Sequence, residues 1–409
     1  MTSRVQYRYP DDVLIAGGGH VGLTLALALR RAAPSLSVSL VDAAGPAHHD
    51  GRASAIAAAG RRMLETLGVW PAMADEAQPI TDMIVTDSRT RDAVRPVFLT
   101  FAGPAGDGQP FAHMVMNRTM VDALHAAALE AGVQVITPDA VVDFTTSHAL
   151  VSARLGQGGE VPARLMVAAD GLKSRLRDLA GIGTANWSYG QSAIVATVAH
   201  ERPHGGRAEE HFLPAGPFAI LPLRGNRASL VWAERSEDAN RIIADSLVFQ
   251  LELERRFGHR LGRIETVGQP RAFPLGLTLA RNFVKPRLAL AGDAAHGIHP
   301  IAGQGLNLGF RDVAALAETI VEAHRLGLDI GSLAVLERYE RWRRFDTFEM
   351  GVVTDTLNRM FSNDHPALRL ARDVGLGIVD RLPGFKKLFI QEAAGEGGAL
   401  PRLLRGQAI

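Results

Sequence analysis

Cysteine is absent from this chain of 409 residues. Disulfide bonds, thiolate metal sites, iron–sulfur clusters and cysteine nucleophiles are therefore excluded together. The absence fits the cytosol, where disulfide bonds are rare. We therefore expect a cytoplasmic protein.

An excess of charge of either sign is also missing. Lys and Arg number 44 against 43 Asp and Glu, which leaves a net charge of +1. Such a chain has no global field to attract nucleic acid. Aromatic residues are only 6% of the chain, and no basic cluster is interleaved with them. Nucleic-acid binding is therefore not expected.

One uncharged segment is nearly long enough to span a membrane. Residues 13–29 contain no Asp, Glu, Lys or Arg, and a spanning helix needs about 20 apolar residues. However, Gly17, Gly18 and Gly19 follow a β-like run near its start. A strand, a glycine turn and a helix explain the segment better than one spanning helix. The first ten residues are polar, so we expect neither a signal peptide nor a transmembrane segment.

The N-terminal part predicts a βαβ unit. A strand over 12–16 ends in the glycines, and a helix rich in Ala and Leu runs to about residue 33, before Pro34. The alternating run 36–41 predicts the second strand. Further helices are predicted over 54–67, ended by Gly68, and over 117–131.

The middle of the chain changes character twice. From residue 161, the run LMVAADG is typical of a buried parallel strand that ends in a turn. Residues 187–273 instead contain short alternating runs separated by Pro, Gly and Asn, which predict an inserted antiparallel sheet. Parallel-strand character returns at 287–290, a helix is predicted over 306–325, and 332–409 is predicted to be helical.

These patterns predict an α/β fold, with a Rossmann-like domain, an inserted antiparallel β-sheet domain and C-terminal helices. At about 150 residues per domain, the length allows two or three such units. The Rossmann-like domain would take residues 1–78, 113–186 and 274–331. The inserted sheet would take 79–112 and 187–273, and the helical region 332–409.

The glycines near the N-terminus form the first motif. Gly17-x-Gly19-x-x-Gly22 follows a strand and opens a helix, and Asp42 ends the next strand. The first glycine makes a tight turn, the second admits a pyrophosphate, and the third lets helix and strand pack, while the carboxylate accepts ribose hydroxyls. Alone the glycines are a weak pattern, and a merely structural turn is the alternative. With this context we predict dinucleotide binding, and Asp42 favours FAD or NAD over NADP.

Two later motifs also follow predicted strands. Asp170-Gly171 precedes a basic stretch, although such a pair is usually only a turn. Gly292-Asp293 begins a stretch that continues through His299-Pro300 to Gly303-Gln304-Gly305-Leu306-Asn307 at a helix start. An acidic group after a strand suits a ribityl hydroxyl, and a glycine-rich helix N-terminus stabilises negative charge.

The order of these motifs resembles that of the group A flavoprotein monooxygenases, whose fold is that of p-hydroxybenzoate hydroxylase. More narrowly, Asp50-x-Arg52-x-x-Ala55-Ile56 and the stretch GDAAHGIHPIAGQGLNLGFRDV are similar to the ubiquinone-biosynthesis hydroxylases. The resemblance covers about residues 10–350.

The resemblance implies roles along the cofactor. The ADP half of FAD would be held by Gly17, Gly19, Gly22 and Asp42. The pyrophosphate and ribityl regions would be reached by Arg52, Arg118, Asp170, Gly292 and Asp293. The isoalloxazine would be near Pro300, Gly303, Gln304, Gly305, Leu306 and Asn307. Surface ion pairs are the alternative for the two arginines.

The resemblance also implies the reaction. NAD(P)H would reduce FAD, and a C4a-hydroperoxyflavin formed with O₂ would hydroxylate a polyprenylated phenol. No second strand–GxGxxG–helix unit occurs in the sequence, so the reductant would meet FAD transiently. The sequence names no acid or base residue, because the hard chemistry belongs to the cofactor. The rival functions are hydroxylation of a small soluble aromatic compound and a non-catalytic flavin-bound component of a complex.

Three further features have two interpretations each. His296 and His299 line a loop or bind a metal, and we expect no metal. The aromatic and histidine residues of the inserted sheet form its core or line a substrate pocket, namely His204, His211, Trp187, Tyr189, Phe212, Phe218 and Trp232. The C-terminal residues 383–409 combine basic side chains with apolar ones, namely Phe385, Leu388, Phe389, Ile390, Leu400, Leu403 and Leu404. They form a packed terminal helix or a partner surface, for which a ubiquinone-biosynthesis complex is the candidate partner, or they contact the inner face of the membrane or a lipid substrate.

Overall fold

The computed structural model describes residues 9–45, 51–87, 97–102, 108–298, 304–361 and 394–409. Its first sheet is built on the predicted βαβ unit of β1 (Asp11–Ala16), α1 (His20–Ala32) and β2 (Val38–Val41). The strand order is β17-β18-β11-β1-β2-β8, with β10 and β9 attached beside β11. The other strands are β8 (Gln134–Ile136), β9 (Val141–Thr146), β10 (Val151–Leu155), β11 (Glu160–Ala168), β17 (Val284–Lys285) and β18 (Leu288–Leu290).

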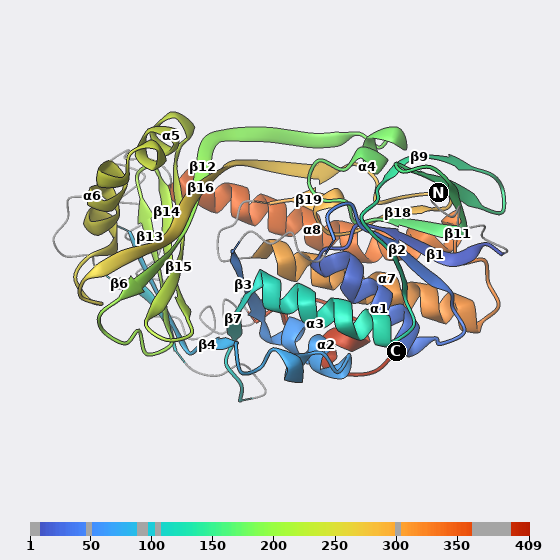
Figure 1. Ribbon diagram of the computed structural model, residues 1–409, viewed down its shortest axis with the longest axis horizontal. Coiled ribbons are helices and arrows are strands. Elements are labelled where there is room, and N and C mark those ends of the chain that lie inside the picture. Colours follow the sequence, from blue (N-terminus) through green and yellow to red (C-terminus); the bar gives the residue numbers. More distant parts are fainter. Residues whose placement is uncertain (1–8, 46–50, 88–96, 103–107, 299–303, 362–393) are drawn as a thin grey trace.

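The five strands β18, β11, β1, β2 and β8 are parallel to their neighbours in this order. Their central members β1 and β2 are almost wholly buried and mostly apolar, as is typical of parallel strands covered on both faces. Helices α1, α3 (Asn117–Glu130) and α7 (Gln304–Arg325) lie together in the same half of the molecule (Figure 1). They share the largest apolar core with the sheet.

The second sheet also has eight strands, in the order β19-β16-β12-β15-β14-β13-β5-β6. Neighbours are antiparallel except for β13 and β5, which are parallel. Strands β12 and β16 have 17 residues each and run side by side along the top of Figure 1, back to the first sheet. The strand bounds are β5 (Asp82–Asp87), β6 (Val97–Ala102), β12 (Thr184–His200), β13 (Arg207–Leu213), β14 (Gly216–Leu223), β15 (Arg227–Arg235), β16 (Ile264–Ala280) and β19 (His296–Gly297). The predicted α/β fold with an inserted sheet is thus confirmed.

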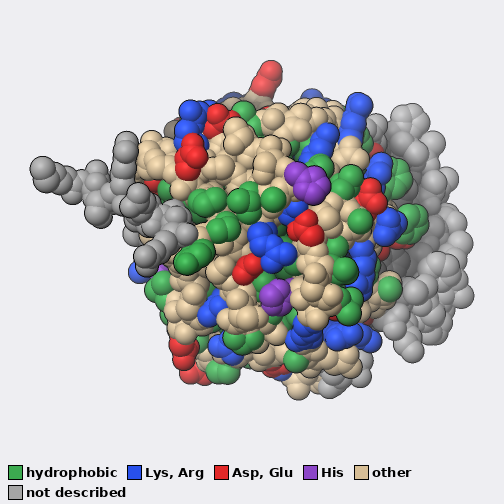
Figure 2. Space-filling view, turned by 90° about the vertical axis from the view of Figure 1, so that its right-hand side faces the viewer, with side chains coloured by type: hydrophobic (Ala, Val, Ile, Leu, Met, Phe, Trp, Pro, Cys, Tyr) green, Lys and Arg blue, Asp and Glu red, His purple; other side chains and the backbone are tan. Residues whose placement is uncertain are grey.

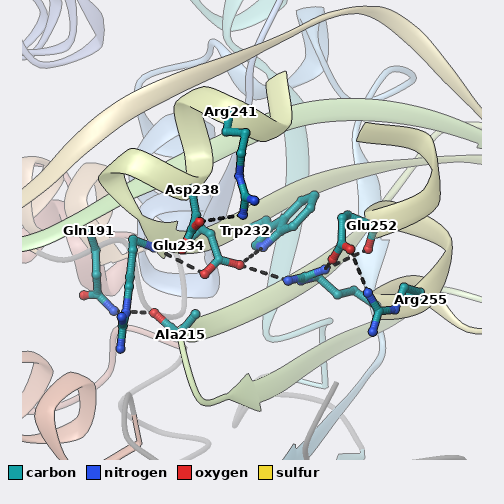
Figure 3. Close-up of polar contacts among 10 residues, drawn as sticks. Gln191, Ala215, Trp232, Glu234, Asp238, Arg241, Glu252 and Arg255 are labelled. Atoms are coloured by element: carbon teal, nitrogen blue, oxygen red, sulfur yellow. Dashed lines mark hydrogen bonds and ion pairs between the residues drawn. The ribbon is translucent and has the colours of Figure 1, made fainter. Parts of the chain in front are cut away.

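Two helices that the sequence analysis missed, α5 (Ser236–Ala244) and α6 (Ser246–Phe257), cover the outer face of this sheet. Beneath them, Phe218 and Trp232 are buried in a second apolar core. Glu234 Oε2 accepts hydrogen bonds from Trp232 Nε1 at 3.3 Å and from Arg256 of α6 at 3.0 Å (Figure 3). Helices α5 and α6 and buried hydrogen bonds therefore close this face of the sheet, and the opposite face is the one that can line a cavity.

A small third sheet, β3-β7-β4, joins the two halves. Its strands are β3 (Ala53–Ala57), β7 (Ala112–Met116) and β4 (Gln78–Ile80). The predicted helix over 54–67 is therefore wrong at its start, since α2 spans only Ala58–Thr66. Alanine favours helix, but antiparallel pairing of β3 with β7 overrides that weak preference.

The C-terminal residues include the long helix α8 (Leu333–Phe361), and the last described ones, 394–409, contain the short 3₁₀ helix η4 (Arg402–Arg405). Leu403 and Leu404 are only 2% and 1% exposed and belong to the main core. The Ala59 N–H donates to the Ala394 carbonyl at 3.0 Å, and the Arg62 Nε donates to that of Leu404 at 3.1 Å. An interface role for Leu403 and Leu404 is therefore wrong, because they pack inside the protein. Phe385, Leu388, Phe389 and Ile390 lie outside the described residues.

The end of the molecule that Figure 2 shows carries basic and acidic side chains interspersed with each other. That mixture fits the net charge of +1. None of the helices among the described residues combines the length and hydropathy that a bilayer span requires.

Candidate active site

Parallel strands of the first sheet end together at one edge. Ala16 is in register with Val41 on one side and with Ala168 on the other, and Ala168 is in register with Leu290. The residues that follow these strands therefore start from the same edge, where α/β sheets bind ligands. These residues carry the three predicted motifs. Gly17 and Asp42 belong to the first motif, Asp170 to the second and Gly292 to the third.

The three glycines of the first motif differ in what surrounds them. Gly17 has a φ of +121°, and a Cβ there would collide with the carbonyl oxygen of Ala169. A Cβ on Gly22 would collide with the carbonyl oxygen of Gly17. The protein's own packing therefore requires both of these glycines.

Gly19 stands in open space instead. Its backbone is extended, with a φ of −77°, and a Cβ there would meet no atom within 4 Å. It is the N-cap of α1, where no side chain caps the backbone N–H groups. An uncapped helix N-terminus beside an open glycine suits a phosphate. The glycine at this position fits a bound diphosphate rather than a requirement of the fold.

Asp42 lies next to this turn. A Cβ on Gly18 would come 2.5 Å from the Asp42 Cγ, so the carboxylate lies directly against the glycines. Its Oδ2 accepts a hydrogen bond from the Gly45 N–H at 2.9 Å, which holds the side chain in place. The geometry is that expected of a ribose acceptor beside a diphosphate site.

A cavity of about 540 Å³ extends from this edge to the inner face of the second sheet. Gly19, Arg52 and Asp293 line its cofactor end, together with Gly305 at the start of α7, where a Cβ would again meet nothing within 4 Å. One continuous space thus joins the glycine turn to the second sheet. Its shape can accept an extended dinucleotide with a second ligand beyond it.

Asp293 faces this cavity from η2 (Gly292–Ala294), directly after β18. Water reaches its side chain through the cavity, although protein surrounds it on the other sides. Burial raises the pKa of this carboxyl above its ordinary value, while His296 and Arg52 act in the opposite direction. A ligand that donates hydrogen bonds would favour the charged form of such a group.

Asp312 of α7 anchors the turn that carries Asp293. Its Oδ2 accepts from the Gly292 N–H at 2.9 Å and lies 2.6 Å from His296 Nε2, and its Oδ1 accepts from Arg343 Nε of α8 at 2.8 Å. Burial would raise its pKa, but His296 and Arg343 together lower it, so Asp312 is ionised. His296 is thus held by Asp312, and the described residues contain no group of three side chains suited to a metal ion.

The two predicted arginines lie in different environments. Arg52 lines the cavity, and its guanidinium lies 5.1 Å from the centre of the Phe273 ring. Arg118 is exposed and pairs with Asp122 one helical turn away, at 3.5 Å. Arg52 is therefore positioned to meet a ligand, whereas Arg118 has the surface ion pair that was its alternative.

Asp170 turns toward the protein. It accepts hydrogen bonds from the Ser174 hydroxyl at 2.5 Å and from the Leu176 N–H at 3.2 Å, at the start of α4 (Arg175–Leu179). Its neighbours Ala169 and Gly171 line the cavity instead. Its carboxylate thus orders the turn at the strand end.

The start of α7 lies at the cavity as the sequence predicted. The lining includes Gln304, Gly305, Leu306 and Asn307. The Asn307 side chain also bonds to β3, accepting from the Ala57 N–H at 2.9 Å and donating to the Ala55 carbonyl at 3.0 Å. It fixes the helix start against the third sheet. The predicted residues His299, Pro300 and Gly303 lie outside the described residues.

The inner face of the second sheet forms the far wall of the cavity. Alternate residues of its central strands line it, namely Ala193, Val195, Ala208, Glu210, Ala219, Leu221, Ser229 and Val231. Phe218 and Trp232 lie on the other face, so the core interpretation is correct for both. The aromatic residues that do line the cavity, Phe111 and Phe273, were not among the predicted candidates.

Comparison with known proteins agrees with this geometry. The model of the FAD binding domain family matches residues 11–345. The chain is 48% identical to the ubiquinone hydroxylase UbiL of Rhodospirillum rubrum, over 97% of this chain and 92% of that protein. It is 36% identical to the 3-demethoxyubiquinol 3-hydroxylase of Escherichia coli, over 94% of this chain and 99% of that protein. The predicted resemblance to the ubiquinone-biosynthesis hydroxylases is confirmed.

Solved structures share the fold. The p-nitrophenol 4-monooxygenase PnpA of Pseudomonas putida superimposes with a TM-score of 0.81 at 18% identity, over 96% of this chain and 99% of that one. The flavin-dependent monooxygenase PieE, solved with FAD and substrate, gives a TM-score of 0.71 at 18% identity, over 98% and 73%. At such identities the likeness concerns the fold alone.

Proposed function

Because this chain belongs to the FAD binding domain family, we propose that it is an FAD-dependent monooxygenase. It hydroxylates the aromatic ring of a polyprenylated phenol in ubiquinone biosynthesis and uses NAD(P)H and O₂ as co-substrates. The observation that carries the proposal is the single cavity that joins the open Gly19 turn to an apolar sheet face. Such a cavity can hold a flavin dinucleotide with a substrate ring beyond it.

The chain's own residues would hold FAD along the first sheet. The N–H groups at the start of α1 would bind the diphosphate beside Gly19, and Asp42 would accept the ribose hydroxyls. Asp293 would accept the ribityl hydroxyls, and Gly305 would let the ring system approach the α7 N-terminus. Bound FAD would supply electron transfer from NAD(P)H and the activation of O₂.

The second sheet would hold the substrate. Ala193, Ala208 and Ala219 leave space on its inner face for a ring, and the apolar wall excludes water from it. A small aromatic acid is a poorer fit, because Arg52 is the single cation of the described cavity lining and lies at the cofactor end. Glu210 on the sheet face would also repel an anionic substrate.

Turnover with defined substrates tests the proposal. The purified protein with FAD should oxidise NAD(P)H faster when a short-tailed prenylphenol is added, and the product should contain one oxygen atom from ¹⁸O₂. A small aromatic acid should not have this effect. If no prenylphenol stimulates oxidation, the protein is a non-catalytic flavin-binding component. Analysis of the intermediate that accumulates in a ubiquinone-deficient strain, with and without this chain, would identify the carbon that is hydroxylated.

We also propose a peripheral contact with the cytoplasmic face of the membrane or with a ubiquinone-biosynthesis complex, because a prenyl tail partitions into a bilayer. Support comes from α8, where Phe345 and Phe348 are 71% and 60% exposed. They are three residues apart and therefore share one face of the helix. Replacement of both by serine should reduce sedimentation with liposomes without changing FAD content. Unchanged sedimentation would exclude this face.

A further inference from the structure

Two neighbouring glutamates on β13 point in opposite directions, because side chains alternate along a strand. Glu209 lies on the side away from the cavity, where its Oε2 is 3.2 Å from Nε2 of His211. Glu210 lies on the inner face and lines the cavity, beside Ala219, its register partner on β14. Both are buried, at 8% and 4% exposure. The sheet thus directs one carboxylate into the cavity and keeps the other outside it.

Most of the described residues that line the cavity wall beside Glu210 are apolar. The adjoining lining residues include Met83, Leu221 and Val231, and the nearest lining hydroxyl along the sheet is that of Ser229. Among the described lining residues, the other carboxylate is Asp293, at the cofactor end. Acidic side chains are rarely buried on apolar walls, and those that open into a cavity are candidates for acid–base chemistry.

We propose that Glu210 is a catalytic residue that accepts the proton of the substrate's ring hydroxyl. This inference rests on the proposed function, since the hydroxyl belongs to the phenol that is oxidised. In the bound state the carboxylate accepts a hydrogen bond from the phenolic O–H. A carboxylate is a pure acceptor when ionised, so it selects a ring that carries a hydroxyl and rejects one that carries a carboxylate.

The proton transfer follows from the loss of electron density by the ring during hydroxylation. As a ring carbon gains an oxygen atom derived from O₂, the ring loses electron density and its hydroxyl becomes strongly acidic. The O–H bond then breaks, its electron pair forms the C=O bond of a dienone, and the proton moves to Glu210. The ring becomes aromatic again when the attacked carbon loses its own proton, which combines with the second oxygen atom of O₂ as that atom leaves as water, and Glu210 returns its proton to the carbonyl oxygen. The carboxylate thus ends in its starting state.

Substitution of Glu210 tests this role against a purely structural one. Glu210→Gln keeps the shape of the side chain but is not a base at neutral pH, so kcat for a short-tailed prenylphenol should fall about 100-fold or more. The acidic limb of the kcat/KM profile should disappear, and Glu210→Asp should restore it in part. Glu209→Gln is the matched control, because it removes a buried carboxylate from the same strand on the other face, and it should retain the limb. FAD content is measured for each variant.

A second measurement needs no variant. If Glu210 acts on the ring hydroxyl, the wild-type enzyme should oxidise the O-methyl ether of the same prenylphenol at least about 100-fold more slowly than the phenol. Glu210→Gln should lower the rate on the phenol but not the rate on the ether. Equal wild-type rates on phenol and ether, or a Gln variant with the wild-type profile, would overturn the proposal while leaving the hydroxylase function intact. Failure of the wild type on every prenylphenol would instead overturn the proposed function.

Discussion

Gly19→Val should separate cofactor binding from folding. The extended backbone of Gly19 suits any residue, and a side chain there meets no protein atom within 4 Å. The substitution therefore introduces no strain into the protein without cofactor. The side chain would instead occupy the space that a diphosphate needs at the α1 N-terminus.

The expected free energies of unfolding, with and without FAD, follow from these two facts. Replacing a glycine by alanine where the backbone suits alanine stabilises a protein by about 0.4–1 kcal/mol through the unfolded state, whereas valine is less favourable than glycine at an N-cap. These effects oppose each other, so the unfolding free energy of the apoprotein should change by less than about 1 kcal/mol. FAD at 100 times its dissociation constant should add about 2.7 kcal/mol to the wild type and nothing to the variant.

Chemical denaturation with and without FAD measures both quantities, and the flavin released on heat denaturation of the purified protein gives occupancy. Gly22→Val is the matched control, because a Cβ at Gly22 collides with the Gly17 carbonyl oxygen. That control should unfold more easily even without FAD. Full flavin occupancy in Gly19→Val, or an apoprotein as unstable as the Gly22 variant, would refute the assignment of this turn.

Three further predictions concern the support of the site. Asp293→Ala should weaken FAD binding by about 10-fold or more in a fluorescence titration, since each charge-assisted hydrogen bond is worth about 1.5–3 kcal/mol; unchanged affinity would make Asp293 a turn cap. Asp312→Leu should lower the unfolding free energy by about 3–5 kcal/mol, because it removes the buried carboxylate that pairs with both Arg343 and His296 and leaves Arg343 with Asp346 alone; a loss below 1 kcal/mol in urea would contradict this. Deletion of 394–409 should give insoluble, colourless protein, because it removes the buried Leu403 and Leu404 from the core; a soluble yellow product would show that this packing is dispensable.

The motifs of the first sheet could be predicted because local chemistry determines them. A glycine that turns a strand into a helix, as at Gly17 and Gly22, is needed wherever that connection is tight. The parallel pairing that brings Asp42 and Gly292 to the same edge also follows from the βαβ pattern. The hydrogen bond from the Gly292 N–H to Asp312 could not be predicted, because no sequence pattern shows that helix α7 packs against this turn.

The errors of prediction have separate physical causes. The strand β3 is rich in alanine, and its pairing partner β7 is more than 50 residues away in the sequence, so no local pattern marks it as a strand. Helix α6 did carry a local sequence signal. Asp245 accepts from the backbone N–H groups of Leu247 and Val248 at 2.8 and 3.2 Å, which is an N-cap of α6. The strand-like runs of β15 and β16 on both sides of this segment favour a continuous antiparallel sheet more strongly than one N-cap residue favours a helix.

The second sheet has two unlike faces, one covered by helices and one that lines the cavity. For this reason the residues of this sheet that face the cavity are the hardest part of the site to predict from the sequence. Along β13, alternation alone places Ala208 and Glu210 on one face and Glu209 on the other, but it does not decide which face meets the cofactor. That choice is made by α5 and α6, which cover one side with an apolar core, and by the long strands β12 and β16, which turn the other side toward the first sheet. The same sequence AEEHF would place Glu209 in the cavity if the helices covered the opposite face. Which carboxylate of β13 faces the cavity is therefore set by the packing of helices on the opposite face of the sheet.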